Sequence, residues 1–226
     1  MSLTRAALES ELLQELLEIP EIRPLILNEA QMQASIRETL EQRAPKSDIW
    51  VFACGSLIWN PLIKFVEHRV GTVNGWHRQF CLWTPVGRGT SSNPGLVLGL
   101  EPGGSCGGVA YRIAAADIPS ELLCLWRREM IASAYIPRWI KVFDGIEEIE
   151  AIAFTVNFHH PMYVGELSEE AIVNTLASAT GSFGSSADYL MQTVSGLRAV
   201  GIQDELLFEL HNKLLAQQKS SNSATD

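Results

Sequence analysis

The sequence of 226 residues contains no apolar run as long as the roughly 18–20 residues that a membrane-spanning helix requires. Its first five residues lack the basic-then-apolar pattern of a secretory signal. Runs rich in lysine and arginine are also missing, and 26 acidic against 17 basic residues give a net charge of −9. Such a surface disfavours nucleic acid and anionic membranes as partners. We therefore expect a cytoplasmic protein whose partner is a small molecule or another protein.

Cysteine is scarce as well. The four cysteines, Cys54, Cys81, Cys106 and Cys124, form no C-x-x-C pair. Their spacing is typical neither of a zinc site nor of a secreted domain held together by disulfides, so we expect reduced thiols. The 46% hydrophobic content and the length are those of a globular protein with a sizeable core.

Leucines at helical spacing characterise the first forty residues. They predict helices over residues 4–18 and 25–42, which Pro20 and Pro24 separate. The sequence Ala-Pro-Lys-Ser at residues 44–47 then predicts a hinge. The organisation that we expect is an N-terminal helical extension over residues 1–45, a main domain over 46–218 and a disordered tail over 219–226.

Short β-type runs broken by glycine and proline begin at residue 49. A helix expected over residues 119–134, with Asp117 and Pro119 as start signals, interrupts them. The number of runs predicts a small barrel or a strongly curved sheet. The runs cover residues 49–53, 66–73, 78–83, 96–100, 108–113, 139–143 and 149–157, and three more helices are expected over 168–179, 186–200 and 203–217.

A loop containing glycine, Cys54-Gly55-Ser56-Leu57, follows the first β-type run. Such loops expose consecutive backbone N–H groups that can hold a carboxylate or an oxyanion, and Gly55 lets a ligand approach the backbone closely. The loop lacks the spacing and the lysine of a P-loop. A Gly-Ser pair after a strand is most often just a turn, so these residues leave both interpretations open.

Glu129 lies on an apolar stripe of the helix expected over residues 119–134. Arg127 and Arg128 point roughly 200° and 100° away from it around an α-helix, so we expect neither to be its partner. Burial of an unpaired carboxylate raises its pKa from about 4.3 toward neutrality, which suits a general base. The alternative is that Glu129 pairs with an arginine or caps a backbone elsewhere in the fold. Its neighbours at helical spacing are Leu122, Leu125, Trp126, Ala132, Ser133 and Ile136.

Six motifs are distributed over about residues 48–215. They are Trp50-Val51-Phe52, Cys54-Gly55-Ser56-Leu57-Ile58-Trp59-Asn60-Pro61, Gly75-Trp76-His77-Arg78, Gly87-Arg88-Gly89-Thr90, Gly107-Gly108-Val109-Ala110-Tyr111-Arg112 and Leu125-Trp126-Arg127-Arg128-Glu129-Met130. In order and spacing they resemble the ChaC family of γ-glutamylcyclotransferases. The set as a whole is far more specific than any single motif, and the N-terminal helical extension lies outside it.

The resemblance implies an α+β fold, a six-stranded β-barrel flanked by helices. It also implies conversion of glutathione to 5-oxoproline and cysteinylglycine, with no metal and no organic cofactor. Glu129 matches the catalytic glutamate of the family, and Tyr189, within Asp188-Tyr189-Leu190, looks like a pocket residue unless it is simply a half-buried helix aromatic. The substrate-binding segment of the family corresponds to Val51, Phe52, Ala53, Cys54, Gly55 and Ser56, with Leu57 next to it.

One departure from the family pattern concerns this loop, which usually reads Gly-Tyr-Gly-Ser. Here Ala53 and Cys54 precede Gly55. We expect the backbone donors at Gly55 and Ser56 to be kept, because they do not depend on the side chain that is replaced. Whatever the tyrosine ring and hydroxyl contribute in the family is lost in this chain.

A γ-glutamyl amide can cleave itself, because its α-amine can reach its own side-chain carbonyl and close a five-membered lactam. We expect Glu129 to take a proton from the α-ammonium group, with a pKa of about 8, and to return one to the departing cysteinyl amine. The N–H groups of Gly55, Ser56 and Leu57 are expected to hold the glutamyl carboxylate or the oxyanion. Arg88, in a glycine-rich loop, either pairs with the glycyl carboxylate of glutathione or is a solvated surface charge.

Other interpretations stay open. One is hydrolysis with Cys54 as nucleophile and a histidine as base, although a small thiol beside a pocket is the simpler interpretation. Another is a non-catalytic binding or regulatory protein that keeps the fold, and the helices of residues 4–42 can serve as a homodimer surface or pack on the chain's own barrel. A metal pair at His159-His160 is disfavoured by the lack of further ligands at helical spacing. The histidines considered as bases are His68, His77, His159 and His160.

Overall fold

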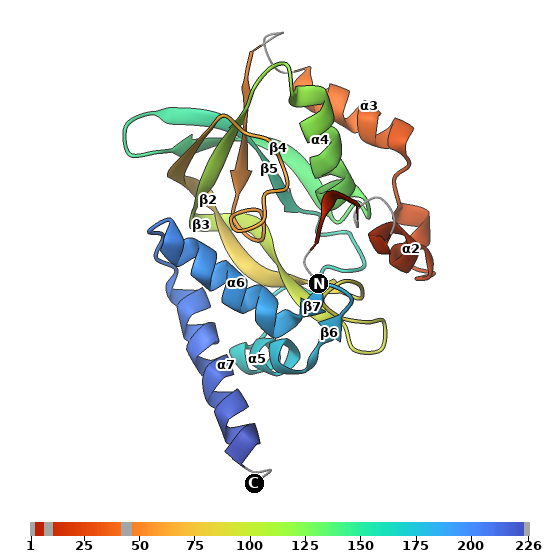
Figure 1. Cartoon of the computed structure of the whole chain (residues 1–226), viewed down its shortest axis with the longest axis vertical. Coiled ribbons are helices and arrows are strands. Elements are labelled where there is room, and N and C mark those ends of the chain that lie inside the picture. Colours follow the sequence, from red (N-terminus) through yellow and green to blue (C-terminus); the bar gives the residue numbers. More distant parts are fainter. Residues whose placement is uncertain (1–2, 7–10, 42–46, 224–226) are drawn as a thin grey trace.

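The computed structural model describes residues 3–6, 11–41 and 47–223. A β-barrel forms its centre and helices cover it on two sides (Figure 1). Neighbouring strands run antiparallel except at the junction of the first and the last strand, which is parallel. The barrel closes in the order β1-β3-β2-β4-β5, with β1 at Ile49–Ala53, β2 at Glu67–Thr84, β3 at Gly95–Ile113, β4 at Tyr135–Phe143 and β5 at Glu148–Val156.

The barrel therefore has five strands, and the expected number of six is wrong. The two β-type runs on either side of Gly75 belong to one long strand, β2, and the two on either side of residue 104 belong to β3. Gly75 has φ of 81°, and the register shifts there, between Asn74 and Trp76. Glycine thus bends these strands through bulges without ending them. Dividing the sequence into β-type runs at its glycines therefore predicted too many strands.

The helices form two groups. In the first group, α3 packs against α4, the π-helical turn η2 and β4, and in the second α5, α6 and α7 pack on one another, with α5 and α6 against β3 (Figure 1). Within the described residues no helix is long and apolar enough to cross a membrane. The first group comprises α2 (Glu11–Leu17), the 3-10 turn η1 (Arg23–Leu25), α3 (Glu29–Leu40), α4 (Ile118–Leu125) and η2 (Trp126–Met130). The second comprises α5 (Glu169–Ser178), α6 (Ser186–Ala199) and α7 (Glu205–Ser223), with the short strands β6 (Thr180–Gly181) and β7 (Gly184–Ser185).

The helices expected after residue 161 occur within a few residues of their predicted bounds. The last one, α7, continues to Ser223, so part of the segment 219–226 that we expected to be disordered is helical. Residues 224–226 and most of the hinge expected at 44–47 lie outside the described residues. The division into an extension, a main domain and a tail stays a prediction.

The N-terminal helices pack on the chain's own barrel. Leu16, Ile22 and Met32 are buried in the same apolar cluster as the barrel residues. The indole of Trp126, in η2, also donates to the hydroxyl of Ser35 in α3 at 3.0 Å. A homodimer through these helices stays a prediction.

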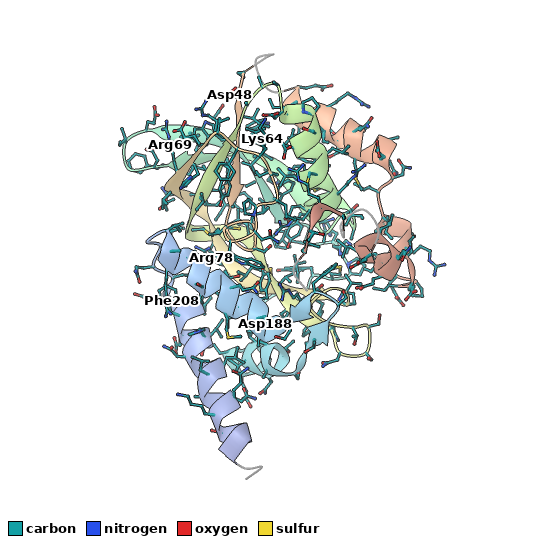
Figure 2. The ribbon with its side chains drawn as sticks, in the orientation of Figure 1. Asp48, Lys64, Arg69, Arg78, Asp188 and Phe208 are labelled. Carbon is teal, nitrogen blue, oxygen red and sulfur yellow. The ribbon has the colours of Figure 1, made fainter. Side chains whose placement is uncertain are left out.

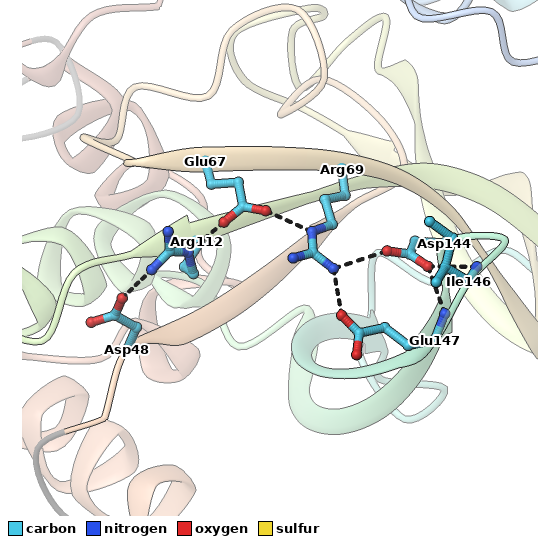
Figure 3. A network of polar contacts seen from close by, with 7 residues as sticks. All are labelled: Asp48, Glu67, Arg69, Arg112, Asp144, Ile146 and Glu147. Atoms are coloured by element: carbon cyan, nitrogen blue, oxygen red, sulfur yellow. Dashed lines mark hydrogen bonds and ion pairs between the residues drawn. The ribbon is translucent and has the colours of Figure 1, made fainter.

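A chain of ion pairs crosses the outside of the barrel (Figure 3). Arg112 joins Asp48 at 2.5 Å and Glu67 at 2.8 Å. Arg69 joins the same Glu67 at 2.6 Å and continues to the β4–β5 hairpin. The network thereby links β1, β2, β3 and that hairpin by charge-assisted hydrogen bonds. On the hairpin, Arg69 contacts Asp144 at 3.0 Å and Glu147 at 2.7 Å.

A buried arginine fixes the far side of the glycine loop. Arg78 is buried between the barrel and the C-terminal helices (Figure 2), where its Nε lies 2.7 Å from Asp204 at the start of α7. Its Nη1 donates to the carbonyl of Cys54 at 2.5 Å, and its Nη2 donates to the carbonyl of Gly107. One guanidinium therefore ties the end of β1, strand β3 and α7 together.

Candidate active site

Two adjoining cavities lie at the end of the barrel where β1 delivers the glycine loop. The outer cavity has a volume of about 180 Å³, and the inner one about 40 Å³. A cavity needs a volume of roughly 10–15 Å³ to hold one water molecule, so the inner cavity has room for about three groups the size of water. Four residues line both cavities and thus mark their junction: Ser56, Glu129, Tyr135 and Tyr189.

Glu129 occupies this junction on the π-helical turn η2, which directly continues α4. Its side chain is 14% exposed and has a basic partner, because Nε of Arg128 lies 3.1 Å from its Oε1. The expectation that Arg128 points away is therefore wrong. Two loop atoms hold the guanidinium on this side: Nη2 donates to the Ser56 hydroxyl at 2.8 Å, and Nη1 donates to the Asn60 carbonyl at 2.5 Å.

The surroundings of Glu129 shift its pKa in two opposite directions. Burial raises the pKa of the carboxyl group above its ordinary value, and the charge of Arg128 offsets part of this rise. The net shift is upward, which confirms the expected direction and its expected main cause. A carboxyl group whose pKa is raised holds a proton more readily than an ordinary one, as a residue that both accepts and returns a proton requires.

The glycine loop forms the wall opposite Glu129. It is closed as a turn by the N–H of Ile58, which donates to the carbonyl of Gly55 at 2.9 Å. Among the described residues, no hydrogen bond uses the N–H groups of Gly55, Ser56 or Leu57, and all three residues line the inner cavity. A side chain at position 55 would have its Cβ 3.2 Å from the Tyr189 hydroxyl, a tight contact that glycine avoids.

Two tyrosines that line the inner cavity bond to the two backbone groups of Leu98 in β3. The Tyr135 hydroxyl donates to the Leu98 carbonyl at 3.0 Å, whereas the Tyr189 hydroxyl accepts from the Leu98 N–H at 3.3 Å. Since Tyr189 accepts there, its own O–H can donate to a ligand. Burial raises the pKa of both hydroxyl groups, which keeps them protonated at neutral pH.

Helix capping positions Tyr189. Ser185 and Asp188 form a capping box, in which the Ser185 hydroxyl accepts from the Asp188 N–H at 3.0 Å. The carboxylate of Asp188 accepts in return from the Ser185 N–H at 3.3 Å. This box fixes the start of α6, so the next residue, Tyr189, is held against the barrel.

Arg88 lines the outer cavity on the loop after β2. It donates to the Ser185 carbonyl at 3.3 Å and to the Gln192 side chain at 3.4 Å, and its guanidinium carbon lies 5.9 Å from the centre of the Trp59 ring. Among the described residues, no carboxylate forms an ion pair with it, and burial lowers its pKa. Arg88 is thus a partly buried cation at the cavity wall, and the charge of Asp188 nearby offsets part of the effect of burial on its pKa.

Cys54 lies at the inner end of the loop and is hydrogen-bonded to the thiol of Cys106. This bond and burial raise the pKa of the Cys54 thiol well above its ordinary value, which is the opposite of what a nucleophilic thiolate requires. The described histidine contacts lie elsewhere: His77 contacts Gly103 and Gln79, His160 accepts from Met162, and His68 packs on Phe65 and Tyr111. Within the described part of the chain, no three His, Cys, Asp or Glu side chains gather as a metal site would need.

The structure brings most of the expected site residues together. Phe52, Cys54, Gly55, Ser56 and Leu57 line the inner cavity, Arg88 lines the outer one, and Glu129 and Tyr189 line both. Val51 and Ala53 line neither cavity, because alternation along β1 turns their side chains into the main apolar core. Sequence reasoning missed Arg128 and Tyr135. Arg128 was part of the Trp-Arg-Arg-Glu motif, so the motif could have pointed to it. No pattern around Tyr135 distinguished that residue.

The barrel with this site has the fold of γ-glutamyl cyclotransferases of known structure. A crystal structure of the yeast enzyme specific to glutathione superimposes with a TM-score of 0.68 at 21% identity, covering 74% of this chain and 97% of that one. At this identity the likeness shows the fold alone.

Sequence comparisons then establish the family. The model of the ChaC-like proteins matches residues 49–217. The glutathione-specific γ-glutamylcyclotransferase of Escherichia coli K12 is 39% identical over 197 residues, which cover 85% of each chain. The glutathione-specific γ-glutamylcyclotransferase 1 of Danio rerio is 30% identical over 180 residues, covering 76% of this chain and 92% of that protein. This chain belongs to the ChaC-like family.

Proposed function

We propose that this chain is a γ-glutamylcyclotransferase that converts glutathione to 5-oxoproline and cysteinylglycine. The observation that carries the proposal is the place of Glu129, a mostly buried carboxylate with a raised pKa at the junction of two cavities. The names of the relatives that match most of the chain support glutathione as the substrate. A γ-glutamylcyclotransferase needs one group that carries a proton beside the bond that breaks. Glu129, at the junction of the cavities, can be this group.

The inner cavity would take the amino and carboxylate end of the glutamyl group. Its size suits a few small polar groups, and the N–H groups of Gly55, Ser56 and Leu57, which have no acceptor among the described residues, are donors for a carboxylate or an oxyanion. The Tyr189 hydroxyl adds a further donor. The scissile amide then lies at the junction, next to Glu129.

The reaction needs no water and no external nucleophile. The glutamyl amine loses a proton to Glu129 and attacks its own side-chain carbonyl carbon, so a C–N bond forms and closes the five-membered ring. The C–N bond to the cysteinyl nitrogen breaks, and Glu129 returns the proton to that nitrogen. The second proton, which the ring nitrogen sheds as it becomes the lactam N–H, completes the ammonium group of the departing cysteinylglycine. The products contain every atom of glutathione, and the carboxylate is regenerated.

The outer cavity would hold the departing cysteinylglycine. Arg88 has no described carboxylate partner and packs beside Trp59, so it can bind the glycyl carboxylate. We also propose that the protein acts in the cytoplasm, since its four cysteines are unpaired. The match over residues 49–217 supports residues 46–218 as the catalytic domain.

Release of 5-oxoproline from glutathione by the wild type and by Glu129→Gln tests this proposal. We expect turnover to fall by about 10²–10⁴-fold, the usual contribution of a positioned acid and base. Glu170→Gln, which removes an exposed carboxylate on α5, is the matched control and should keep full activity. Undiminished turnover by Glu129→Gln would refute the role of Glu129. Calorimetric binding of glutathione without any 5-oxoproline from the wild type would instead identify a non-catalytic binding protein.

A further inference from the structure

The N-terminal extension supplies one wall of the outer cavity. Leu3, Leu12 and Leu16 line it together with Arg88 and Glu129. These leucines lie outside residues 49–217, which the family model matches. Leu16 is fully buried, whereas Leu3 and Leu12 are half-buried, as expected for side chains at a cavity surface.

Polar contacts hold this wall against both loops that face the substrate. The carboxylate of Glu15, in α2, accepts from the N–H of Gly87, next to Arg88, at 3.1 Å. The side chain of Asn60, in the loop after β1, donates to the carbonyl of Leu3 at 3.0 Å. These bonds need specific backbone groups on each loop, so the extension is positioned relative to the site and does not merely cover it.

The extension is also attached to the element that carries Glu129. The Leu27 N–H donates to the Ile131 carbonyl at 2.9 Å, one residue beyond η2. The Ser133 hydroxyl donates to the Leu25 carbonyl at 2.9 Å. The wall, the two loops and the catalytic turn thus form one connected unit.

We infer that Leu12 and its neighbours Leu3 and Leu16 determine specificity by contacting the second residue of the γ-glutamyl substrate and limiting its size. This inference rests on the proposed function and names the part of the substrate that the extension selects. The inner cavity and the junction fix the glutamyl group and the amide, and Arg88 fixes the far carboxylate. What remains between them, against the leucines, is the cysteinyl side chain, a small and largely apolar group that suits such a wall.

Glutathione and S-hexylglutathione differ only at this side chain and therefore measure the wall directly. We expect the wild type to prefer glutathione strongly. Leu12→Ala should shift the ratio of kcat/KM values toward S-hexylglutathione by about 10–200-fold, the range found when a hydrophobic pocket gains or loses room. Leu12→Phe should shift the ratio in the opposite direction, so a general loss of folding cannot imitate the result.

Leu17→Ala is the matched control, because Leu17 lies on the same helix, is 43% exposed and does not line the cavity. It should leave the ratio unchanged. Equal ratios in the wild type, Leu12→Ala and Leu12→Phe would overturn the inference, and so would a shift as large in Leu17→Ala.

Calorimetric Kd values for the same two compounds separate this inference from the proposed function. If the wild type releases no 5-oxoproline but the ratio of Kd values changes in Leu12→Ala and Leu12→Phe as described for kcat/KM, the proposed function is refuted and the inference about the leucines is supported. If turnover is normal and substitutions at position 12 change neither the kcat/KM ratio nor the Kd ratio, the inference about the leucines is refuted and the proposed function is supported. If neither compound binds, both are refuted.

Discussion

The ion pair between Arg128 and Glu129 limits how far burial raises the pKa of the carboxyl group. The side chains are 5% and 14% exposed, and Nε lies 3.1 Å from Oε1. An arginine this close lowers the pKa of a carboxyl group by about 1–3 units, so its removal should raise the pKa of Glu129 by a similar amount. Arg128→Gln removes the charge and keeps an amide that can donate to the Ser56 hydroxyl or the Asn60 carbonyl.

The sign follows from the role of Glu129 as a base. It must be deprotonated to accept the proton of the substrate, so activity rises as pH rises through its pKa. In Arg128→Gln this acid limb should lie about 1–3 pH units higher, and each unit should lower the rate about tenfold at pH values below the limb. Tyr135, Tyr189 and Cys54 also face Glu129, but their raised pKa values keep them uncharged near neutral pH.

The measurement is kcat/KM for 5-oxoproline release from glutathione across acid and neutral pH. The groups of the substrate titrate identically for every variant and cancel in the comparison. Arg127→Gln is the matched control, because Arg127 pairs with Glu29 at 3.0 Å on the surface and should leave the limb in place. A limb that stays put in Arg128→Gln, or moves to lower pH, would refute the electrostatic coupling, even if the overall rate falls.

Two further predictions concern Arg88 and Arg69. Arg88→Gln should lower kcat/KM for glutathione by about 10–150-fold, from the roughly 1.5–3 kcal/mol of a hydrogen bond to a charged group, and should hardly affect glutathione whose glycyl carboxylate is an amide. Equal losses for both substrates would exclude a contact with that carboxylate. The hydrogen bond from Arg69 lowers the pKa of Glu67, so this pair stabilises the fold above the ordinary carboxyl pKa of about 4 and loses its effect as pH falls through the lowered value. Arg69→Gln should therefore lower Tm at neutral pH and approach the wild type in acid, and a Tm difference independent of pH would contradict this.

Local patterns in the sequence determined much of the fold and part of the site. The 3.6-residue periodicity located the later helices, and the apolar neighbours of Glu129 predicted its burial and the upward shift of its pKa. The motif order identified the family and the glycine loop. These properties depend on neighbours along the chain, which is why the sequence alone contains them.

Contacts between distant segments were decided by the tertiary structure. Pairing across the bulge at Gly75 joins two expected strands into one, and β-strand periodicity does not reveal whether a glycine bends a strand or ends it. Ser56 and Asn60 draw Arg128 toward Glu129 because the loop after β1 folds over η2. Tyr135 reaches the site from β4.

The position of Glu129 and that of its partner Arg128 are therefore determined by different parts of the chain. The apolar neighbours of Glu129 come from its own helix, whereas the positive charge beside it depends on a loop about seventy positions earlier in the sequence. The leucine wall likewise depends on where Leu3, Leu12 and Leu16 pack, because helical periodicity does not indicate which cavity an apolar face will line.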